Sequence, residues 1–118
     1  MSEFFTIICT ADVARQELLD TVEWVIGRGD GDLLVLSDNA AFLTQRYFPL
    51  QNQERRLKNL RYLTKEVLPI ILVEEDDDLE KLVKKDSTII LLRYENKKFR
   101  EAIRKMFHGR KIKILPKE

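Results

Sequence analysis

Hydroxyl and acidic side chains follow two apolar runs of this chain, where they could hold a metal ion or a phosphate group. Thr10 and Asp12 come directly after the first run. Glu74 and Asp76 come directly after the third run. Because Mg²⁺ prefers carboxylate oxygens, Asp12, Glu74 and Asp76 are the candidate ligands of a magnesium ion. The alternative is that these acids cap the helices that follow them, since helix N-termini favour acidic residues.

A small ligand that carries phosphate is the second chemistry that these positions allow. The hydroxyl group of Thr10, the free amides of helix N-termini and the guanidinium group of Arg93 could converge on an anion. The candidate ligand-binding residues are therefore Thr10, Asp12, Glu74, Asp76 and Arg93. They suggest a nucleotide, a phosphate or magnesium-dependent phosphate chemistry. The alternative for Arg93 is an ion pair with the acidic residues that follow the third run.

Residues for nucleophilic catalysis do not come together in this sequence. Cys9 lies inside the first apolar run, which is typical of a buried small hydrophobic residue. The single histidine, His108, stands at the end of an expected helix, far from the strand ends that carry the acids. No Ser-His-Asp or Cys-His set can be assembled around it. The sequence therefore favours a non-enzymatic binding or regulatory module.

The charges are segregated along the chain, although the net charge is only +1. The net charge is −6 over residues 1–45 and +5 over residues 46–65. It is −5 over residues 66–86 and +7 over residues 87–118. The two basic segments each contain an expected helix, so basic helix surfaces are predicted.

A basic helix surface is a typical footprint of a nucleic-acid partner. The outward residues of the two basic helices are Arg55, Lys58, Arg61, Tyr62, Lys65, Lys97, Lys98, Arg100, Arg104 and Lys105. Tyr62 stands among the cations of the first helix and could stack on a base. Two alternatives remain open: a solvated helix face, and a surface for an acidic protein partner.

Four short apolar runs, at 4–9, 33–36, 69–73 and 88–92, predict strands that are buried on both faces. A fifth strand is predicted at 111–115, where polar and apolar residues alternate. Charged segments with helical periodicity separate these runs. The expected helices cover 12–27, 51–66, 77–85 and 95–108, with a short aromatic-rich helix that begins at 37–38.

This alternation predicts a single α/β domain, 1–118, with three layers and a five-stranded, mostly parallel sheet that lacks a final helix. A flavodoxin-like or Rossmann-like topology follows, with the strand order 2-1-3-4-5 favoured. That order would place the helix at 12–27 alone on one face and the other long helices together on the opposite face. The two basic helices would then share one surface.

A single helix does not cover five strands, so the face that carries the helix at 12–27 is expected to be under-covered. This predicts a homodimer through that face, with Trp24 near its rim. The alternative is that the segment at 38–50, or the lysine stems of the last strand, covers the gap.

The glycine-rich segment at 27–31 is predicted to be a turn between a helix and a strand. A phosphate-cradling loop requires the opposite order, a strand followed by a helix. This segment therefore suggests no phosphate site.

The composition is that of a soluble globular protein on the charge-rich side, with 44% hydrophobic and 35% charged residues. The N-terminus has no basic and apolar signal pattern, and every apolar run is far shorter than the roughly 20 residues of a membrane span. We therefore expect a cytoplasmic protein without membrane partners. The high charge and low glycine content are compatible with a thermophilic source.

The expected topology resembles that of response-regulator receiver domains, which also have acidic residues at strand ends. That family has an acid pair after the first strand and an aspartate after the third, where this chain has Asp12 and Glu74. It has Ser or Thr after the fourth strand, where Arg93 stands. The resemblance therefore covers topology alone and implies no phosphoacceptor.

Overall fold

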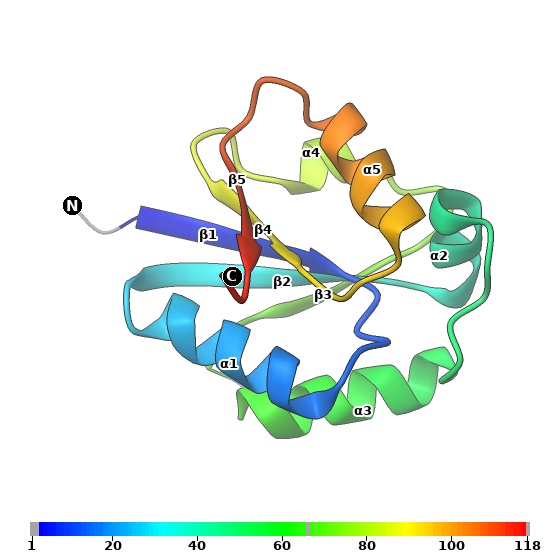
Figure 1. Ribbon diagram of the computed structural model, residues 1–118, viewed down its shortest axis with the longest axis horizontal. Coiled ribbons are helices and arrows are strands. Elements are labelled where there is room, and N and C mark those ends of the chain that lie inside the picture. Colours follow the sequence, from blue (N-terminus) through cyan, green and yellow to red (C-terminus); the bar gives the residue numbers. More distant parts are fainter. Residues whose placement is uncertain (1–2, 66, 118) are drawn as a thin grey trace.

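The computed structural model describes residues 3–65 and 67–117, which form five strands and five helices (Figure 1). The strands are β1 (Glu3–Cys9), β2 (Gly29–Leu36), β3 (Ile70–Val73), β4 (Thr88–Leu92) and β5 (Ile112–Leu115). The helices are α1 (Arg15–Ile26), α2 (Asp38–Gln45), α3 (Gln53–Thr64), α4 (Leu79–Leu82) and α5 (Lys97–Met106). All five expected strands are present, and residue 66 of the expected helix at 51–66 lies outside the described residues.

The strands form one parallel sheet in the order β3-β2-β1-β4-β5, flanked by helices on both sides. The predicted three-layer α/β domain is therefore confirmed, with the Rossmann-like order rather than the flavodoxin-like order. The predicted order 2-1-3-4-5 is wrong because β3 pairs with β2, where Leu33 lies opposite Ile70, and not with β1.

The position of β3 decides which helices share a face. Right-handed crossovers that step in the same direction across a sheet place their helices on the same side. The chain steps one way from β1 to β2 to β3 and the other way from β3 to β4 to β5. Accordingly, α1 and α3 pack on one hydrophobic core, whereas α2, α4 and α5 pack on the other. The predicted isolation of the first helix is therefore wrong.

This arrangement also separates the two basic helices. α3 lies with α1 on one face of the sheet, and α5 lies on the opposite face (Figure 1). The predicted single basic surface made by both helices is therefore wrong. Each helix retains its own exposed cations.

The face of α1 is better covered than the sequence predicts, because α3 joins α1 over it. The half-buried ring of Trp24 meets the ring of Phe5 edge-on, with centroids 5.2 Å apart. Arg28 and Lys113 place their cations 4.1 Å and 5.5 Å from the centroid of the Trp24 ring. The lysine stem of β5 thus covers part of this rim, as the alternative anticipates. Dimerisation stays a prediction. The under-covered face from which it was inferred is covered in part by α3 and by the lysine stem of β5.

Gly31 lies inside β2 rather than in the predicted turn at 27–31, which is confined to its first residues. A Cβ atom on Gly31 would lie 2.6 Å from the carbonyl oxygen of Phe5 and 2.9 Å from a methyl group of Val25. Glycine is therefore required here by the close approach of β1 and α1, and not by a turn.

The described helices are all short. None of them has the length and apolar character that a membrane crossing needs.

Candidate functional site

The strand order reverses between β1 and β4, which is the place where open parallel sheets bind ligands. The chain leaves β1 toward one side of the sheet and leaves β4 toward the other, so the two loops diverge at the carboxyl edge. Thr10, Ala11 and Asp12 arrive there from β1. Glu95 and Asn96 arrive from β4. The predicted location, between the first and third strands, is wrong because β2 lies between β1 and β3.

Glu95 joins the two diverging loops. Its carboxylate accepts hydrogen bonds from the amide of Thr10 at 3.1 Å, from the hydroxyl group of Thr10 at 2.9 Å and from the amide of Ala11 at 3.2 Å. The side chain is only 4% exposed. Burial raises the pKa of Glu95 to about 7, although the hydrogen bonds from Thr10 and Ala11 act in the opposite direction.

A second buried carboxyl group lies beside this junction. Glu17 of α1 accepts the amide hydrogen of Tyr94 at 2.8 Å and is itself buried. Burial raises the pKa of Glu17, while the bond from Tyr94 and the charges of Arg100 and Arg93 lower it. The edge between β1 and β4 thus holds two carboxyl groups that are reluctant to ionise.

The loop after β1 has a constrained backbone. Ala11 has a φ of 65°, in the left-handed region that residues with a Cβ atom seldom adopt. The hydroxyl group of Thr10 accepts the amide hydrogen of Asp12 at 3.2 Å, and Glu95 holds the amide of Ala11. These bonds keep the loop in one conformation, as binding sites often require.

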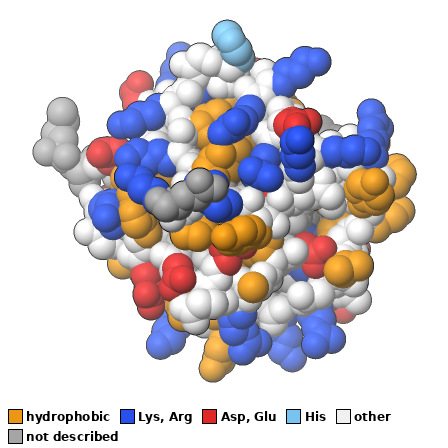
Figure 2. Space-filling model, viewed as in Figure 1, with side chains coloured by type: hydrophobic (Ala, Val, Ile, Leu, Met, Phe, Trp, Pro, Cys, Tyr) orange, Lys and Arg blue, Asp and Glu red, His pale blue; other side chains and the backbone are white. Residues whose placement is uncertain are grey.

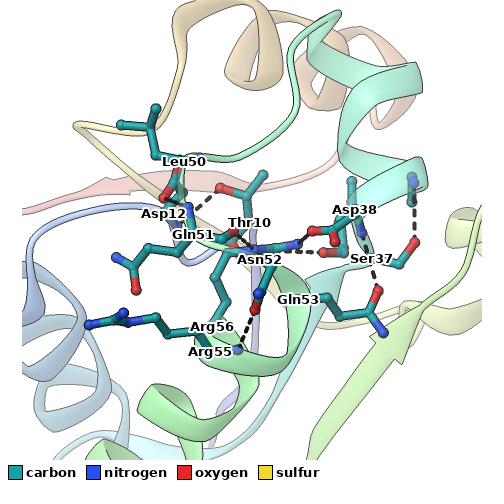
Figure 3. A network of polar contacts seen from close by, with 12 residues as sticks. Thr10, Asp12, Ser37, Asp38, Leu50, Gln51, Asn52, Gln53, Arg55 and Arg56 are labelled. Atoms are coloured by element: carbon teal, nitrogen blue, oxygen red, sulfur yellow. Dashed lines mark hydrogen bonds and ion pairs between the residues drawn. The ribbon is translucent and has the colours of Figure 1, made fainter.

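Arg56 of α3 is fully buried beneath the ends of β1 and β2 (Figure 3). Its guanidinium group donates to the carbonyl oxygens of Thr10 at 2.5 Å and Leu36 at 2.8 Å, and it pairs with Asp38 at 2.6 Å. Its Nε–H donates to the carbonyl oxygen of Gln51 at 3.0 Å. One side chain therefore satisfies polar groups from three separate segments, which explains how a full charge is buried here.

Asp12 connects the loop after β1 to the segment between α2 and α3 (Figure 3). Its carboxylate accepts the amide hydrogens of Leu50 at 2.8 Å and Gln51 at 3.3 Å. The N-cap of α1 is Ala14, which makes no side-chain capping bond. The predicted role of Asp12 as a helix cap is therefore wrong, and its role is to hold a distant segment against the carboxyl edge.

A pocket of about 470 Å³ opens at this edge, and we call it the edge pocket. Its lining residues are Thr10, Asp12, Gln45, Tyr47, Phe48, Leu50 and Asn96. Pockets of this size accommodate small organic ligands. The residues come from the loop after β1, the end of α2 with the segment that follows it, and the N-cap of α5. The pocket therefore depends on the bonds made by Asp12 and Glu95.

Gln45 contributes an unusual polar group to the edge pocket. The residue is only 4% exposed, and its Nε2 donates to the carbonyl oxygen of Tyr47 at 3.1 Å. Its carboxamide oxygen is buried and has no hydrogen-bond partner among residues 3–65 and 67–117. A buried oxygen without a donor costs folding free energy, so a group that supplies the donor would relieve that cost.

Aromatic rings and a cation surround the mouth of the pocket. Phe48 stacks on Phe42, with centroids 4.6 Å apart and planes inclined by 22°. Tyr47 is also exposed, and Lys98 places its ammonium group 5.2 Å from the centroid of the Tyr47 ring. Asn96 is the N-cap of α5 and accepts the amide hydrogen of Lys98 at 2.8 Å, so the positive end of α5 faces this mouth.

The other predicted site residues lie elsewhere. Glu74 follows β3, donates its backbone amide hydrogen to Asp77 at 2.8 Å and lines a different pocket near α4. Asp76 belongs to the same turn after β3. Because β2 lies between β3 and β1, the strand end that carries Glu74 and Asp76 is not adjacent to the strand end that carries Asp12. Over residues 3–65 and 67–117, no group of three or more His, Cys, Asp or Glu side chains could hold a metal ion. The predicted three-carboxylate magnesium site is therefore wrong.

Arg93 stands at the end of β4 beside β5 rather than beside β3. Its Nε–H donates to the carbonyl oxygen of Pro116 at 2.6 Å. The predicted ion pair with the acids after β3 is wrong, since two strands separate them. Arg93 is also absent from the lining of the edge pocket. Of the five predicted ligand-binding residues, only Thr10 and Asp12 line this pocket.

The sequence interpretation missed Glu95, Arg56 and Gln45. Glu95 becomes a candidate once β4 is known to lie beside β1. Arg56 lies four residues before Leu60 and therefore on the inner stripe of its helix, a signal that helical periodicity contains. Nothing in the sequence distinguishes Gln45 from an exposed glutamine.

No protein-family model and no curated protein matches this chain. The fold and the pocket therefore carry the functional interpretation.

Proposed function

We propose that this protein binds a nucleoside monophosphate, or a closely similar planar organic phosphate, in the edge pocket. The observation that carries this proposal is a pocket that joins the exposed rings of Tyr47 and Phe48 to the start of α5, with Gln45 in its lining. A nucleobase offers N–H donors in the plane of a ring that also stacks. It therefore meets the requirements of Gln45 and of the neighbouring rings together.

The aromatic side chains supply the stacking surface. Tyr47 and Phe48 expose more than half of their surface, so both rings are accessible to a ligand. Stacking of a base on an aromatic side chain contributes about 1–3 kcal/mol. The contact between Phe42 and Phe48 fixes the second ring, so less conformational entropy is lost when a base binds.

The start of α5 supplies the preference for an anion. Helix N-termini bind phosphate through free amides and the helix dipole, and Lys98 adds a full positive charge at the same place. The carboxylate of Asp12 is already engaged by two amides, which offsets part of its negative charge. It retains acceptor capacity for the hydroxyl groups of a ribose. The proposal concerns binding and assigns no reaction.

Calorimetric titration with AMP, GMP, CMP and UMP tests this proposal. We expect at least one of them to bind with a micromolar to low-millimolar dissociation constant. Phe48→Ala should weaken that binding about tenfold, because it removes a stacking surface. Tyr94→Ala is the matched control, since Tyr94 is an exposed aromatic residue outside the edge pocket.

Two results contradict the proposal. The first is the absence of heat and of thermal stabilisation with all four nucleotides at 10 mM, tested with about 0.1 mM protein. The second is an equal loss of affinity in Phe48→Ala and Tyr94→Ala, which would place the ligand elsewhere.

A further inference from the structure

The outer surface of α3 concentrates positive charge away from the edge pocket. We call it the α3 surface and define it by Arg15 of α1 and by Arg55, Lys58, Arg61, Tyr62 and Lys65 of α3 and its C-cap. All six side chains are exposed. Basic side chains gather at the lower side of Figure 2, the side on which α3 lies in Figure 1.

The cations of the α3 surface are not neutralised within the described part of the chain. The ion pairs found in residues 3–65 and 67–117 join Arg56 to Asp38, Lys97 to Glu101 and Lys111 to Glu3, and none of them involves this surface. Its one described acidic neighbour on α3 is Glu54, in the first turn, where the helix dipole favours it. Several unpaired cations on one helix face cost electrostatic energy unless an anionic partner binds them.

The α5 cations offer a contrast. Lys97 pairs with Glu101 of the same helix at 3.9 Å, and Lys98 lies over the Tyr47 ring. The surroundings of the cations on the two basic helices therefore differ, although the sequence predicts a basic surface for both. Arg104 and Lys105 of α5 are exposed and join none of the ion pairs found in residues 3–65 and 67–117. The α3 surface therefore differs from α5 by its hollows and its exposed ring rather than by unpaired charge alone.

The α3 surface is hollowed as well as charged. A pocket of about 370 Å³ lies between the start of α1 and α3 and is lined in part by Arg15, Arg55 and Asn59. A second hollow of about 420 Å³ lies on the other side of Arg55 and Asn59 and reaches Lys58. The two hollows share these two residues and adjoin each other. Amide and guanidinium groups line both, and the carboxylate of Glu54 also lines the second.

Tyr62 adds a stacking platform to the α3 surface, outside the lining of the two hollows. Its side chain is 71% exposed, and the guanidinium group of Arg15 lies 5.8 Å from the centroid of its ring. An exposed aromatic ring among cations is the combination by which proteins bind unpaired bases together with their phosphates. From Arg55 to Lys65 the helix rises by roughly 15 Å, enough to follow a few nucleotides.

We infer that the α3 surface binds single-stranded nucleic acid, with phosphates on its arginine and lysine side chains and a base on Tyr62. A duplex satisfies the cations but offers no unstacked base to Tyr62. An acidic protein would satisfy the charges without needing the ring. The single strand is the partner that uses every feature of the surface.

Fluorescence polarisation with labelled twelve-nucleotide oligouridine and oligothymidine, and with a twelve-base-pair DNA duplex, tests this inference. We expect both single strands to bind at least fivefold more tightly than the duplex at 50 mM NaCl. Neutralisation of about four phosphates predicts a loss of affinity on the order of 50-fold between 50 and 200 mM NaCl. The ratio of the affinities for the two single strands shows whether RNA or DNA is the preferred ligand.

Two triple variants with the same change of net charge provide the matched comparison. Arg55→Glu, Arg61→Glu and Lys65→Glu should together weaken single-strand binding at least 20-fold. Lys97→Glu, Arg104→Glu and Lys105→Glu on α5 should weaken it less than threefold. Tyr62→Ala should weaken it three- to tenfold without changing its salt dependence, and circular dichroism of each variant checks that it folds.

Several outcomes overturn the inference: no binding of single strands at 50 mM NaCl, equal losses in the two triple variants, or tighter binding of the duplex. An unchanged affinity in Tyr62→Ala also overturns it and leaves an acidic protein as the better partner. Displacement of the oligonucleotides by 5 mM AMP would place them in the edge pocket instead. Phe48→Ala should leave oligonucleotide binding unchanged, so this inference and the proposed nucleotide site can fail separately.

Discussion

Glu95 accepts hydrogen bonds from both the amide and the hydroxyl group of Thr10, 85 residues earlier in the chain. This contact joins the ends of β1 and β4, the two strands between which the strand order reverses. It explains why the loops at the carboxyl edge keep a defined shape although they diverge. The edge pocket is built on this junction and on the bonds of Arg56 and Asp12.

The buried carboxyl group of Glu95 should make stability depend on pH. Its pKa is about 7 in the folded protein and about 4.5 when exposed. Because the folded pKa is the higher one, the contribution of Glu95 to the free energy of unfolding is complete below pH 4.5. This contribution is lost as the pH rises through 7. The loss amounts to about 3 kcal/mol. Urea unfolding between pH 4.5 and 8 should show a larger loss in the wild type than in Glu95→Gln, which keeps Glu17 and Asp32, two carboxyl groups whose pKa burial also raises. Parallel curves for the two proteins would refute this prediction.

Arg56 should be far more important for stability than its neighbour Arg55. Arg56→Met removes a fully buried cation and leaves the carbonyl oxygens of Thr10 and Leu36 without donors. We expect a loss of about 3–5 kcal/mol in the free energy of unfolding. Arg55→Met, on the exposed side of the same turn, should change it by less than about 0.5 kcal/mol.

Denaturant unfolding of both arginine variants measures this difference. Asp38→Asn provides a milder change if Arg56→Met does not fold, because it removes one charge of the pair at 2.6 Å. Similar unfolding midpoints for the Arg55 and Arg56 variants would show that the buried network contributes little.

Asp12→Ala should loosen the segment before α3 and leave α1 intact. The variant removes the acceptor of the Leu50 and Gln51 amides, at a cost of about 1 kcal/mol. Hydrogen exchange of these two amides should accelerate about fivefold. Asp20→Ala, which removes an exposed carboxylate on α1, is the control. Faster exchange in the first turn of α1 would instead indicate that Asp12 caps that helix.

Gln45→Met should separate stability from ligand binding. The variant removes a buried oxygen that has no partner, and it also removes the bond from Nε2 to Tyr47. These effects oppose each other, so we expect the thermal unfolding of the free protein to change by less than about 1 kcal/mol. Nucleotide affinity should nevertheless fall about tenfold. A large destabilisation with unchanged affinity would assign Gln45 a structural role only.

The strands could be predicted because their sequences contain the signal directly. Ile89 to Leu92 and Leu33 to Leu36 are continuous apolar runs, and both are fully buried between two helix layers. The strand order could not be predicted, because the apolar stripe of α3 fits either face of the sheet equally well. Because β3 was predicted to lie beside β1, the site was expected between these two strands. The same error placed both basic helices on one face of the sheet.

The site residues also differ in whether the sequence could predict them. Thr10 and Asp12 could be found because every residue that follows β1 reaches the carboxyl edge. Glu95 depends on the β1–β4 pairing, which links positions far apart in the sequence. Gln45 depends on how the α2–α3 segment folds back over the edge, and this segment has no pattern that specifies its path.

A titration of the ¹⁵N-labelled protein with AMP, followed through its backbone amide resonances, tests the edge pocket most directly. Our account predicts that the largest shifts occur at residues of the edge pocket, namely Thr10, Asp12, Gln45, Tyr47, Phe48, Leu50 and Asn96. Shifts that are absent up to 10 mM AMP, or that concentrate on α3 between residues 55 and 65, would contradict it.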